Sequence, residues 1–180
     1  MSKKVLIISS SPRQGGNSDT LCDKFMEGAK SVGNEVEKIS LREKKINYCT
    51  SCGFCNSNNY TACSQKDDVS EILDKIIETD VVVFATPVYF YTMCGQLKTL
   101  IDRFCAKYTQ IENKEFYFIM TAADLSSNAM DRVLAEFDGL MACLPGATPM
   151  GAIVATGVWN KGEVDKTIYP QQAFDLGKSI

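Results

Sequence analysis

The segment from Ser9 to Ser18 carries side chains that can hold a phosphate group. It reads Ser-Ser-Ser-Pro-Arg-Gln-Gly-Gly-Asn-Ser. Gly15 and Gly16 allow close backbone approach, and a following helix would add free N–H groups and a positive dipole end. Neither Gly-x-Gly-x-x-Gly nor Gly-Lys-Ser/Thr is present, which favours a phosphate monoester over a dinucleotide or a Walker-type site. The alternative is an ordinary strand-to-helix turn with a Ser or Asn cap. The candidate donors are Ser11, Arg13, Asn17, Ser18 and Thr20.

A second segment, residues 86–98, places three consecutive aromatic side chains where the chain leaves a predicted strand. Tyr89, Phe90 and Tyr91 can stack on a planar ring or shield it from water. Gly95 is expected to begin the next helix, where backbone N–H groups are again free. The alternative is that these aromatic residues only plug the end of the sheet. The small residues Thr121 to Ala123 follow a later strand and would permit backbone contact with a ring edge.

The spacing Cys49-x2-Cys52-x2-Cys55-x7-Cys63 concentrates four thiols in one polar segment. A compact triplet with one distant cysteine favours a 4Fe–4S cluster over zinc, whose four-cysteine sites come as two separated pairs. A local disulfide or reduced thiols are the alternatives. The sequence holds eight cysteines and no histidine, which excludes Ser-His-Asp and Cys-His chemistry. Three further cysteines fall on predicted apolar helix faces and are expected in the core: Cys22, Cys105 and Cys143.

The composition excludes several classes of function. The net charge of −3 and the absence of a long basic run give no support for nucleic-acid binding. No apolar run approaches the length of a membrane span, and the first apolar stretch is too short for a signal-peptide core. Eight cysteines without a secretory signal are more typical of thiols, ligands or redox groups in a reducing compartment. We therefore expect a cytoplasmic protein without membrane or nucleic-acid partners.

Short apolar runs alternate with helical periodicity along the chain. This alternation predicts five β–α units, and hence a parallel sheet with helices on both faces, in one domain over residues 1–180. A polar, cysteine-rich loop is expected at about residues 42–66, followed by a capping box from Asp68 to Glu71. The predicted strands are 5–9, 35–41, 81–85, 116–120 and 152–156, and the predicted helices lie near 18–32, 69–77, 97–105, 130–141 and 173–180. Ligands of such sheets bind at the carboxyl ends of the strands.

These motifs resemble those of the NADPH-dependent FMN reductases. Ser-Pro-Arg-x-x-Gly-Asn-Ser, starting at Ser11, is similar to their FMN phosphate loop. Thr-Pro-Val-Tyr-x5-Gly-Gln-Leu-Lys, starting at Thr86, is similar to their isoalloxazine loop, and Asp102-Arg103 fits its continuation. The resemblance implies a flavodoxin-like three-layer α/β/α fold with a five-stranded parallel sheet. It also implies FMN contacts at Ser9, Ser11, Arg13, Asn17, Ser18, Thr20, Pro87, Val88, Tyr89, Phe90, Tyr91, Gly95, Thr121, Ala122 and Ala123.

By this resemblance the protein is expected to pass electrons from NAD(P)H through bound FMN to a small-molecule or protein acceptor. Hydride transfer to a flavin needs no protein acid or base at the reacting carbon, so no catalytic side chain is assigned. The cysteine spacing also resembles that of the iron–sulfur flavoproteins, which implies Cys49, Cys52, Cys55 and Cys63 as cluster ligands in an electron carrier. A phosphate-binding module without flavin is a third hypothesis. The resemblance further implies a homodimer or higher homo-oligomer.

Overall fold

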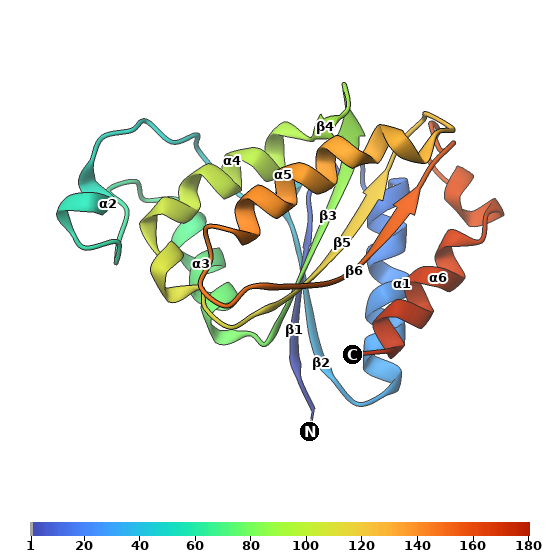
Figure 1. Cartoon of the computed structure of the whole chain (residues 1–180), viewed down its shortest axis with the longest axis horizontal. Coiled ribbons are helices and arrows are strands. Elements are labelled where there is room, and N and C mark those ends of the chain that lie inside the picture. Colours follow the sequence, from blue (N-terminus) through green and yellow to red (C-terminus); the bar gives the residue numbers. More distant parts are fainter. Residues whose placement is uncertain (1) are drawn as a thin grey trace.

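The computed structural model describes residues 2–180 and alternates strands with helices throughout (Figure 1). The strands are β1 (Lys4–Ser9), β2 (Glu35–Ser40), β3 (Val81–Tyr89), β4 (Thr92–Met93), β5 (Glu115–Thr121) and β6 (Thr148–Ala155). The α-helices are α1 (Asn17–Ser31), α2 (Phe54–Ser57), α3 (Val69–Glu78), α4 (Gly95–Asp102), α5 (Asp131–Met141) and α6 (Tyr169–Lys178). Two short 3-10 helices matter below, η2 (Arg103–Ala106) and η5 (Glu163–Lys166).

The sheet has the strand order β2-β1-β3-β5-β6, and all four of these pairings are parallel. This is the order of flavodoxin-like folds, so the predicted five-stranded parallel sheet is confirmed. The short β4 lies off this path and pairs antiparallel with the end of β3. The order reverses between β1 and β3, which places the topological switch point there. Ligands of such sheets bind beside that point, at the carboxyl ends of the strands.

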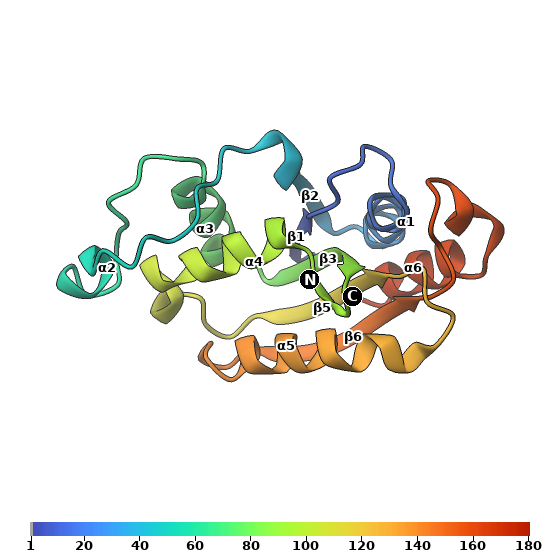
Figure 2. The ribbon, with the colours of Figure 1, turned by 90° about the horizontal axis from the view of Figure 1, so that it is seen from above.

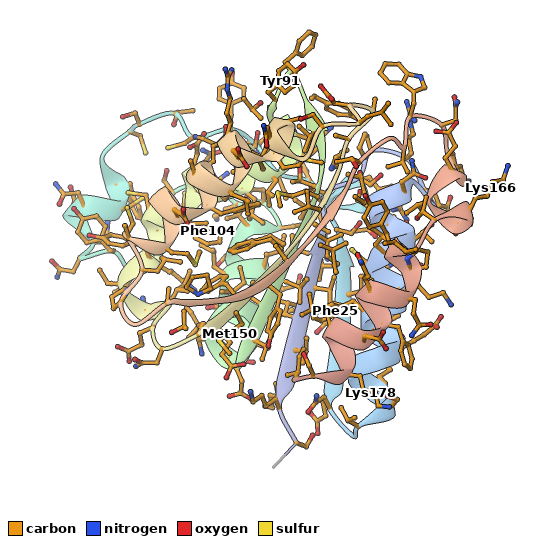
Figure 3. The ribbon with its side chains drawn as sticks, turned by 45° about the vertical axis from the view of Figure 1, so that its right-hand side comes forward. Phe25, Tyr91, Phe104, Met150, Lys166 and Lys178 are labelled. Atoms are coloured by element: carbon orange, nitrogen blue, oxygen red, sulfur yellow. The ribbon has the colours of Figure 1, made fainter. Side chains whose placement is uncertain are left out.

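Alternate residues of the buried strands point to opposite faces of the sheet and so build two separate cores. Leu6, Ile8 and Phe84 face the core under α3, α4 and α5. Val5 and Ile7 face the core under α1 and α6. In Figure 3 the labelled Phe25 and Phe104 lie on opposite sides of the sheet. The near-continuous apolar runs predicted strands buried on both faces, which the three-layer structure explains.

Helices α1 and α6 lie side by side on one face of the sheet, while α3, α4 and α5 cover the other face (Figures 1 and 2). The contact between α1 and α6 is unusually close. A Cβ added at Gly28 would lie 2.0 Å from the carbonyl oxygen of Phe174, and one added at Gly177 would lie 2.1 Å from that of Phe25. Backbone therefore packs directly on backbone there, and only glycine fits at these two positions.

Two differences between the local predictions and the structure have a clear physical cause. Strand β3 continues beyond residue 85 to Tyr89, because β5 still pairs with residues 86 and 87 and β4 gives residues 88 and 89 an antiparallel partner. Asp68 occupies the N-cap position of α3, but its side chain makes no cap hydrogen bond. Its Oδ2 instead accepts from the backbone N–H of Lys45 at 2.6 Å. The neighbouring Asp67 accepts from the N–H of Val69 through Oδ1 at 3.3 Å, so the predicted capping box is wrong.

The cysteine-rich segment is largely irregular, as predicted: between β2 and α3 lie the short 3-10 helix η1 (Leu41–Glu43) and the four-residue helix α2. Seen from above, this segment extends from one end of the molecule, at the side of α3 and α4 and away from α1 and α6 (Figure 2). Within residues 2–180, no helix combines the length and the apolar character needed to cross a bilayer.

Candidate functional site

A cavity opens at the carboxyl ends of β1, β3 and β5, beside the switch point of the sheet. Parallel register brings Ser9 opposite Ala85, and Pro87 opposite Thr121, so the three following loops meet there. Its lining comes from these loops and from the segment after β6. The lining residues are Ser11, Arg13, Gly16, Asn17, Ser18, Pro87, Val88, Tyr89, Thr121, Ala122, Ala123, Val158 and Trp159.

The start of α1 forms a cradle of unused hydrogen-bond donors. Gly16 is the N-cap residue of α1 and has no side chain that could accept a hydrogen bond from the first turn. The first N–H groups of α1 therefore remain available to the loop. A Cβ at Gly16 would lie 2.6 Å from Ser11 Oγ, so the tight turn requires glycine. Among the described residues, the Ser18 hydroxyl is one of two buried side-chain polar groups without a hydrogen-bond partner. A buried hydroxyl in that state is costly unless a ligand accepts from it.

Asp19 holds this loop from beneath. Its Oδ1 accepts from Ser9 Oγ at 2.8 Å, and its Oδ2 accepts from the N–H of Gly15 at 2.9 Å. Lys38 and Arg42 lie 3.2 and 3.4 Å from its carboxylate oxygens. Burial raises the pKa of Asp19, but the hydrogen bonds from Ser9 and Gly15 and the charge of Lys38 outweigh it, so the pKa is lowered. The carboxylate therefore stays ionised and fixes Gly15 in its left-handed conformation, with φ of 60°.

Asn17 attaches the segment after β6 to the same loop. Its amide nitrogen donates to the carbonyl oxygens of Val158 and Asn160, at 3.3 and 2.9 Å. Its amide oxygen accepts from the N–H of Gly162 at 3.1 Å. Arg13 adds a bond from Nη1 to the carbonyl oxygen of Trp159 at 3.1 Å. The indole of Trp159 is left 68% exposed at the mouth of the cavity, where it can cover a planar ligand.

The turn between β3 and β4 projects from the carboxyl edge of the sheet, with Tyr91 at its tip (Figure 3). Phe90 and Tyr91 both have positive φ, 51° and 62°, which a two-residue type I′ turn requires but bulky side chains disfavour. Tyr91 donates from its hydroxyl to Asp124 Oδ2 at 3.1 Å, and Arg132 lies 5.8 Å from its ring centre. Phe90 is 97% exposed. Strained residues of this kind concentrate at functional sites.

A second cavity, which we call the thiol cavity, lies where the cysteine-rich segment meets η2. Its lining includes Cys49, Cys52, Cys55, Cys63, Cys105 and Arg103. All four cysteines of the predicted ligand set are therefore brought to one place. In the described part of the chain, however, no three side chains converge as ligands of a single metal ion. Burial raises the pKa of the Cys55 thiol, and the adjacent thiols of Cys105 and Cys63 raise it further.

A buried ion pair anchors the thiol cavity. The Arg103 side chain is 2% exposed, and its Nη1 donates to Asp67 Oδ2 at 2.8 Å. Nη1 also donates to the carbonyl oxygen of Asn47 at 2.7 Å, while Nη2 donates to Cys63 Sγ at 3.2 Å. Burial raises the pKa of Asp67, but the hydrogen bond from Arg103 and two backbone N–H groups lower it overall. Arg103 thus ties both ends of the cysteine-rich segment to the body of the protein.

The burial of the cysteines outside that segment agrees only in part with the prediction. Cys22, on the buried face of α1, is fully buried, as expected. Cys105 and Cys143 are exposed, so their prediction as core residues is wrong. The helical periodicity ends before Cys105, because α4 stops at Asp102 and gives way to η2. The change in helix type turns the Cys105 side chain out of the apolar face.

A family model described as NADPH-dependent FMN reductase matches residues 3–161, which includes every loop of the first cavity. The chain belongs to the NADPH-dependent FMN reductase family. This agrees with the resemblance of its phosphate and aromatic loops. The family match ends before α6, although α6 completes the core beneath α1.

Individual relatives of this FMN reductase family member include iron–sulfur flavoproteins. An iron–sulfur flavoprotein of Archaeoglobus fulgidus is 41% identical over 100 residues, which cover 56% of this chain and 44% of that protein. One from Methanosarcina thermophila is 34% identical over 100 residues, covering 56% of this chain and 51% of that protein. The chain thus spans about half the length of the curated relatives it matches.

Two solved structures share the fold of this FMN reductase family member. The NAD(P)H:quinone oxidoreductase from Methanothermobacter marburgensis has a TM-score of 0.77 at 18% identity, covering 99% of this chain and 97% of that one. An azoreductase from Bacillus anthracis has a TM-score of 0.77 at 19% identity and full coverage of both chains. At these identities the similarity establishes the flavodoxin-like fold alone.

The structure gathers most of the predicted cofactor residues of this family member into the first cavity, from all three predicted loops. It places five others outside the lining: Ser9, Thr20, Phe90, Tyr91 and Gly95. Ser9 is turned inward to Asp19, and Phe90 and Tyr91 lie beyond the cavity on the turn. The sequence prediction omitted Gly16, Val158 and Trp159 as ligand contacts. Trp159 is the only tryptophan of the chain, and its position in a polar stretch was the available signal.

Proposed function

We propose that the chain binds FMN in the first cavity, as a single domain, and acts there as an NAD(P)H-dependent oxidoreductase. The observation that carries this proposal is the cradle at the start of α1. It combines a glycine turn, free helix N–H groups and a buried hydroxyl at Ser18 that lacks a partner within residues 2–180. That donor set fits a phosphate monoester. Membership of the FMN reductase family supports FMN as that phosphate monoester.

In this proposal the loop after β1 binds the phosphate, with Ser18 as the hydroxyl donor and Arg13 as the nearby cation. Ser11 lines the same site and shapes the turn, because its hydroxyl donates to the carbonyl oxygen of Arg13 at 2.9 Å. Asp19 does not touch the ligand. It positions the Gly15 turn, while Lys38 and Arg42 balance its charge and limit its repulsion of an anion. The phosphate therefore meets neutral and cationic donors, because the acidic group faces away beneath the loop.

The ring would lie between the end of β3 and the segment after β6. Pro87 to Tyr89 and Thr121 to Ala123 supply backbone and small side chains, and Trp159 can cover the ring from the outer side. Bound FMN supplies the hydride and electron-transfer chemistry. The protein orients the ring, excludes water from one face and offers backbone N–H groups to its polar edge. No histidine is needed, consistent with its absence from the sequence.

NADH or NADPH is the proposed electron donor, and a small molecule or protein is the proposed acceptor. A second copy of the chain is the proposed partner, supported by Phe90, which is 97% exposed at the edge of the site. The eight cysteines suit a reducing, cytoplasmic compartment. Size-exclusion chromatography with light scattering tests the homodimer, with Phe90→Ala expected to shift the protein toward monomer.

Titration with FMN and with riboflavin tests the proposed cofactor site. Both ligands carry the same ring, but riboflavin lacks the phosphate. We expect FMN to bind at least about tenfold more tightly, because several charge-assisted hydrogen bonds are lost with riboflavin. Loss of flavin fluorescence reports binding, and anaerobic bleaching of the bound flavin by NADH or NADPH reports the reaction. Equal affinities would contradict the phosphate cradle, and a bound flavin that neither nucleotide bleaches would contradict the reductase.

A second candidate function is that of an electron carrier with a 4Fe–4S cluster. The thiol cavity favours it, because Cys49, Cys52, Cys55 and Cys63 all line it and Arg103 donates to Cys63. Soft thiolates are the donor set that such clusters require, and a buried cation suits an anionic cluster. Because a cluster spreads its four ligands around a cube, the sulfurs need not converge on one point as they would for a single ion.

Anaerobic purification followed by iron and sulfide assays tests this second candidate. The expected content is about four irons and four sulfides per chain. Cys52→Ser is expected to remove most of both, whereas Cys143→Ser, which changes an exposed cysteine outside the ligand set, should leave them intact. Absence of iron and sulfide from the anaerobic wild-type protein would contradict the cluster and leave the FMN proposal unaffected.

A further inference from the structure

The thiol cavity contains one cysteine that the Cys-x2-Cys-x2-Cys-x7-Cys spacing does not include. Cys105 lies on η2, 42 positions beyond Cys63 in the sequence, yet it lines the cavity beside the segment's own cysteines. Its thiol is exposed, and that of Cys55 is partly buried. Helix α2, which carries Cys55, packs against η2. The fold therefore places an accessible thiol next to one of the predicted cluster ligands.

Several contacts hold the residues around these two helices together. Arg103 Nη2 donates to Cys63 Sγ at 3.2 Å on one side. On the other side, Gln110 Nε2 donates to the carbonyl oxygen of Tyr60 at 3.2 Å. The rings of Tyr60 and Tyr108 meet edge to face, with centres 5.2 Å apart. The residues that flank Cys55 and Cys105 thus hold the cysteine-rich segment against η2 and the residues after it.

We propose that Cys55 and Cys105 form a redox-active thiol pair that a peroxide converts to a disulfide. The exposed Cys105 sulfur attacks one oxygen of hydrogen peroxide, the O–O bond breaks, and Cys105 becomes a sulfenic acid as one water leaves. The Cys55 sulfur then attacks the Cys105 sulfur, the S–O bond breaks, and a second water leaves. Two thiols are oxidised by two electrons, and one peroxide is reduced to two waters.

The other cysteines of the segment are engaged elsewhere. Cys63 accepts from Arg103 and from the N–H of Gln65. Cys52 lies 3.4 Å from the Ser64 hydroxyl, and Cys49 accepts from the N–H of Ser51 at 3.4 Å. Cys55 and Cys105 both line the thiol cavity, and they lie on α2 and η2, the two elements that pack against each other there. The geometry therefore selects Cys55 as the partner of Cys105.

The disulfide would have a defined consequence for the thiol cavity. It removes Cys55 from any ligand set, so the disulfide and a four-cysteine cluster exclude one another. It also joins the cysteine-rich segment covalently to the end of α4, since η2 follows α4 directly. Oxidation would thereby convert the thiol cavity from a ligand-binding state to a locked state. This proposal does not depend on flavin binding.

Peptide mapping of the full-length protein tests the proposal directly. The iron content of the purified chain is measured, and the protein is then treated with about one equivalent of hydrogen peroxide. Its remaining free thiols are blocked with a thiol reagent, and the protein is digested with trypsin without reduction. Cleavage releases Phe104–Lys107, which holds only Cys105, and Ile46–Lys66, which holds the four cysteines of the segment. We expect these two peptides to appear joined in iron-free protein, with fragmentation placing the bond at Cys55.

Variants and iron-loaded protein complete the test. Cys105→Ser should abolish the linked peptide and leave one more thiol reactive than in the oxidised wild type, whereas Cys143→Ser, which changes another exposed cysteine, should leave the link intact. Protein that retains a full complement of iron should resist linkage until the iron is removed. A Phe104–Lys107 peptide that stays unlinked after peroxide treatment of iron-free protein would overturn the proposal. Fragmentation that places the bond at Cys49, Cys52 or Cys63 would overturn it as well.

Discussion

The Ser18 hydroxyl is a group whose position suits ligand binding and not folding. It is buried at the first turn of α1, and within residues 2–180 it has no hydrogen-bond partner. Folding therefore gains nothing from this group and bears its desolvation. This buried hydroxyl is therefore better explained by a ligand oxygen than by a contribution to stability.

The prediction for Ser18→Ala has opposite signs for stability and binding. We expect the unliganded protein to keep its stability or gain up to about 1 kcal/mol, because a buried unsatisfied hydroxyl is removed. We expect FMN affinity to fall about tenfold, because one hydrogen bond to the phosphate is lost. Urea denaturation and flavin fluorescence measure the two effects.

Ser31→Ala is the matched control for that experiment. Ser31 lies at the other end of α1 and donates to the carbonyl oxygen of Gly28 at 2.7 Å. Its replacement should leave FMN affinity unchanged and lower stability slightly. If Ser18→Ala destabilised the unliganded chain and left FMN affinity intact, the role of Ser18 as a phosphate donor would be refuted.

A second single residue, Asp19, makes the stability of the folded protein depend on pH. Its pKa is lowered in the folded protein, so its contribution is present above the ordinary carboxyl pKa and is lost as the pH falls through the lowered value. Asp19→Asn should cost about 2 to 3 kcal/mol at pH 7, since Lys38 and Arg42 lose a buried partner. The difference from wild type should shrink as the pH falls below about 4.

Urea midpoints measured at pH 7 and at about pH 3 give this comparison. Asp138→Asn, on the exposed face of α5, serves as the control and should show little change at either pH. A loss of stability for Asp19→Asn that is equally large at both pH values would show that the ionised carboxylate is not what stabilises the loop.

At the scale of elements, the β3–β4 turn combines unfavourable backbone conformations with an exposed aromatic residue. Phe90 has φ of 51° and is 97% exposed, so its side chain gives little packing in return for the strain. Asparagine tolerates the left-handed region far better. The turn therefore holds a residue suited to contacts beyond the chain's own core rather than one suited to the turn itself.

Phe90→Asn should raise the free energy of unfolding by about 1 kcal/mol, because it relieves the left-handed strain. Phe90→Ala is the control, since it removes the same ring without providing a residue that favours positive φ. Thermal and urea unfolding should separate the two variants. Equal stabilities would show that the turn is not strained at this position. FMN affinities of the same variants test the sequence prediction that Phe90 contacts the ring.

For the whole molecule, the spacing between helices α1 and α6 depends on two glycines. Helix α1 carries the phosphate cradle at its start, and it rests on α6 through backbone contacts at Gly28 and Gly177. The position of the cradle is thus set in part by the C-terminal helix. Any larger side chain at these contacts must move one helix relative to the sheet.

Gly28→Ala should lower the free energy of unfolding by at least about 2 kcal/mol, because its Cβ would lie 2.0 Å from the Phe174 carbonyl oxygen. Gly139→Ala in α5 is the matched control, because no atom lies within 4 Å of its added Cβ. That variant should gain about 0.5 to 1 kcal/mol from helix propensity. Chemical denaturation compares them, and a neutral Gly28→Ala would contradict the close α1–α6 packing.

The sequence by itself determined the strands, the order of the β–α units and the loops that form the first cavity. Apolar periodicity is a local property, and the loop chemistry of Arg13 to Ser18 lies within a few residues of chain. The carboxyl-end rule for parallel sheets then placed those loops together without a structure. The same local reasoning located the cysteine-rich segment between β2 and α3.

Only the tertiary structure decided which distant residues complete each site. Trp159 reaches the first cavity because Asn17 attaches its segment to the phosphate loop, a pairing of residues far apart in sequence. In the sequence, Asp19 is only an acidic residue near the start of a predicted helix. In the structure its buried carboxylate accepts hydrogen bonds from Ser9 and Gly15 and so fixes the loop. Cys105 reads as a core residue, and only the change from α4 to η2 exposes it beside Cys55. Periodicity carries no information on such contacts, because they depend on how separate elements pack.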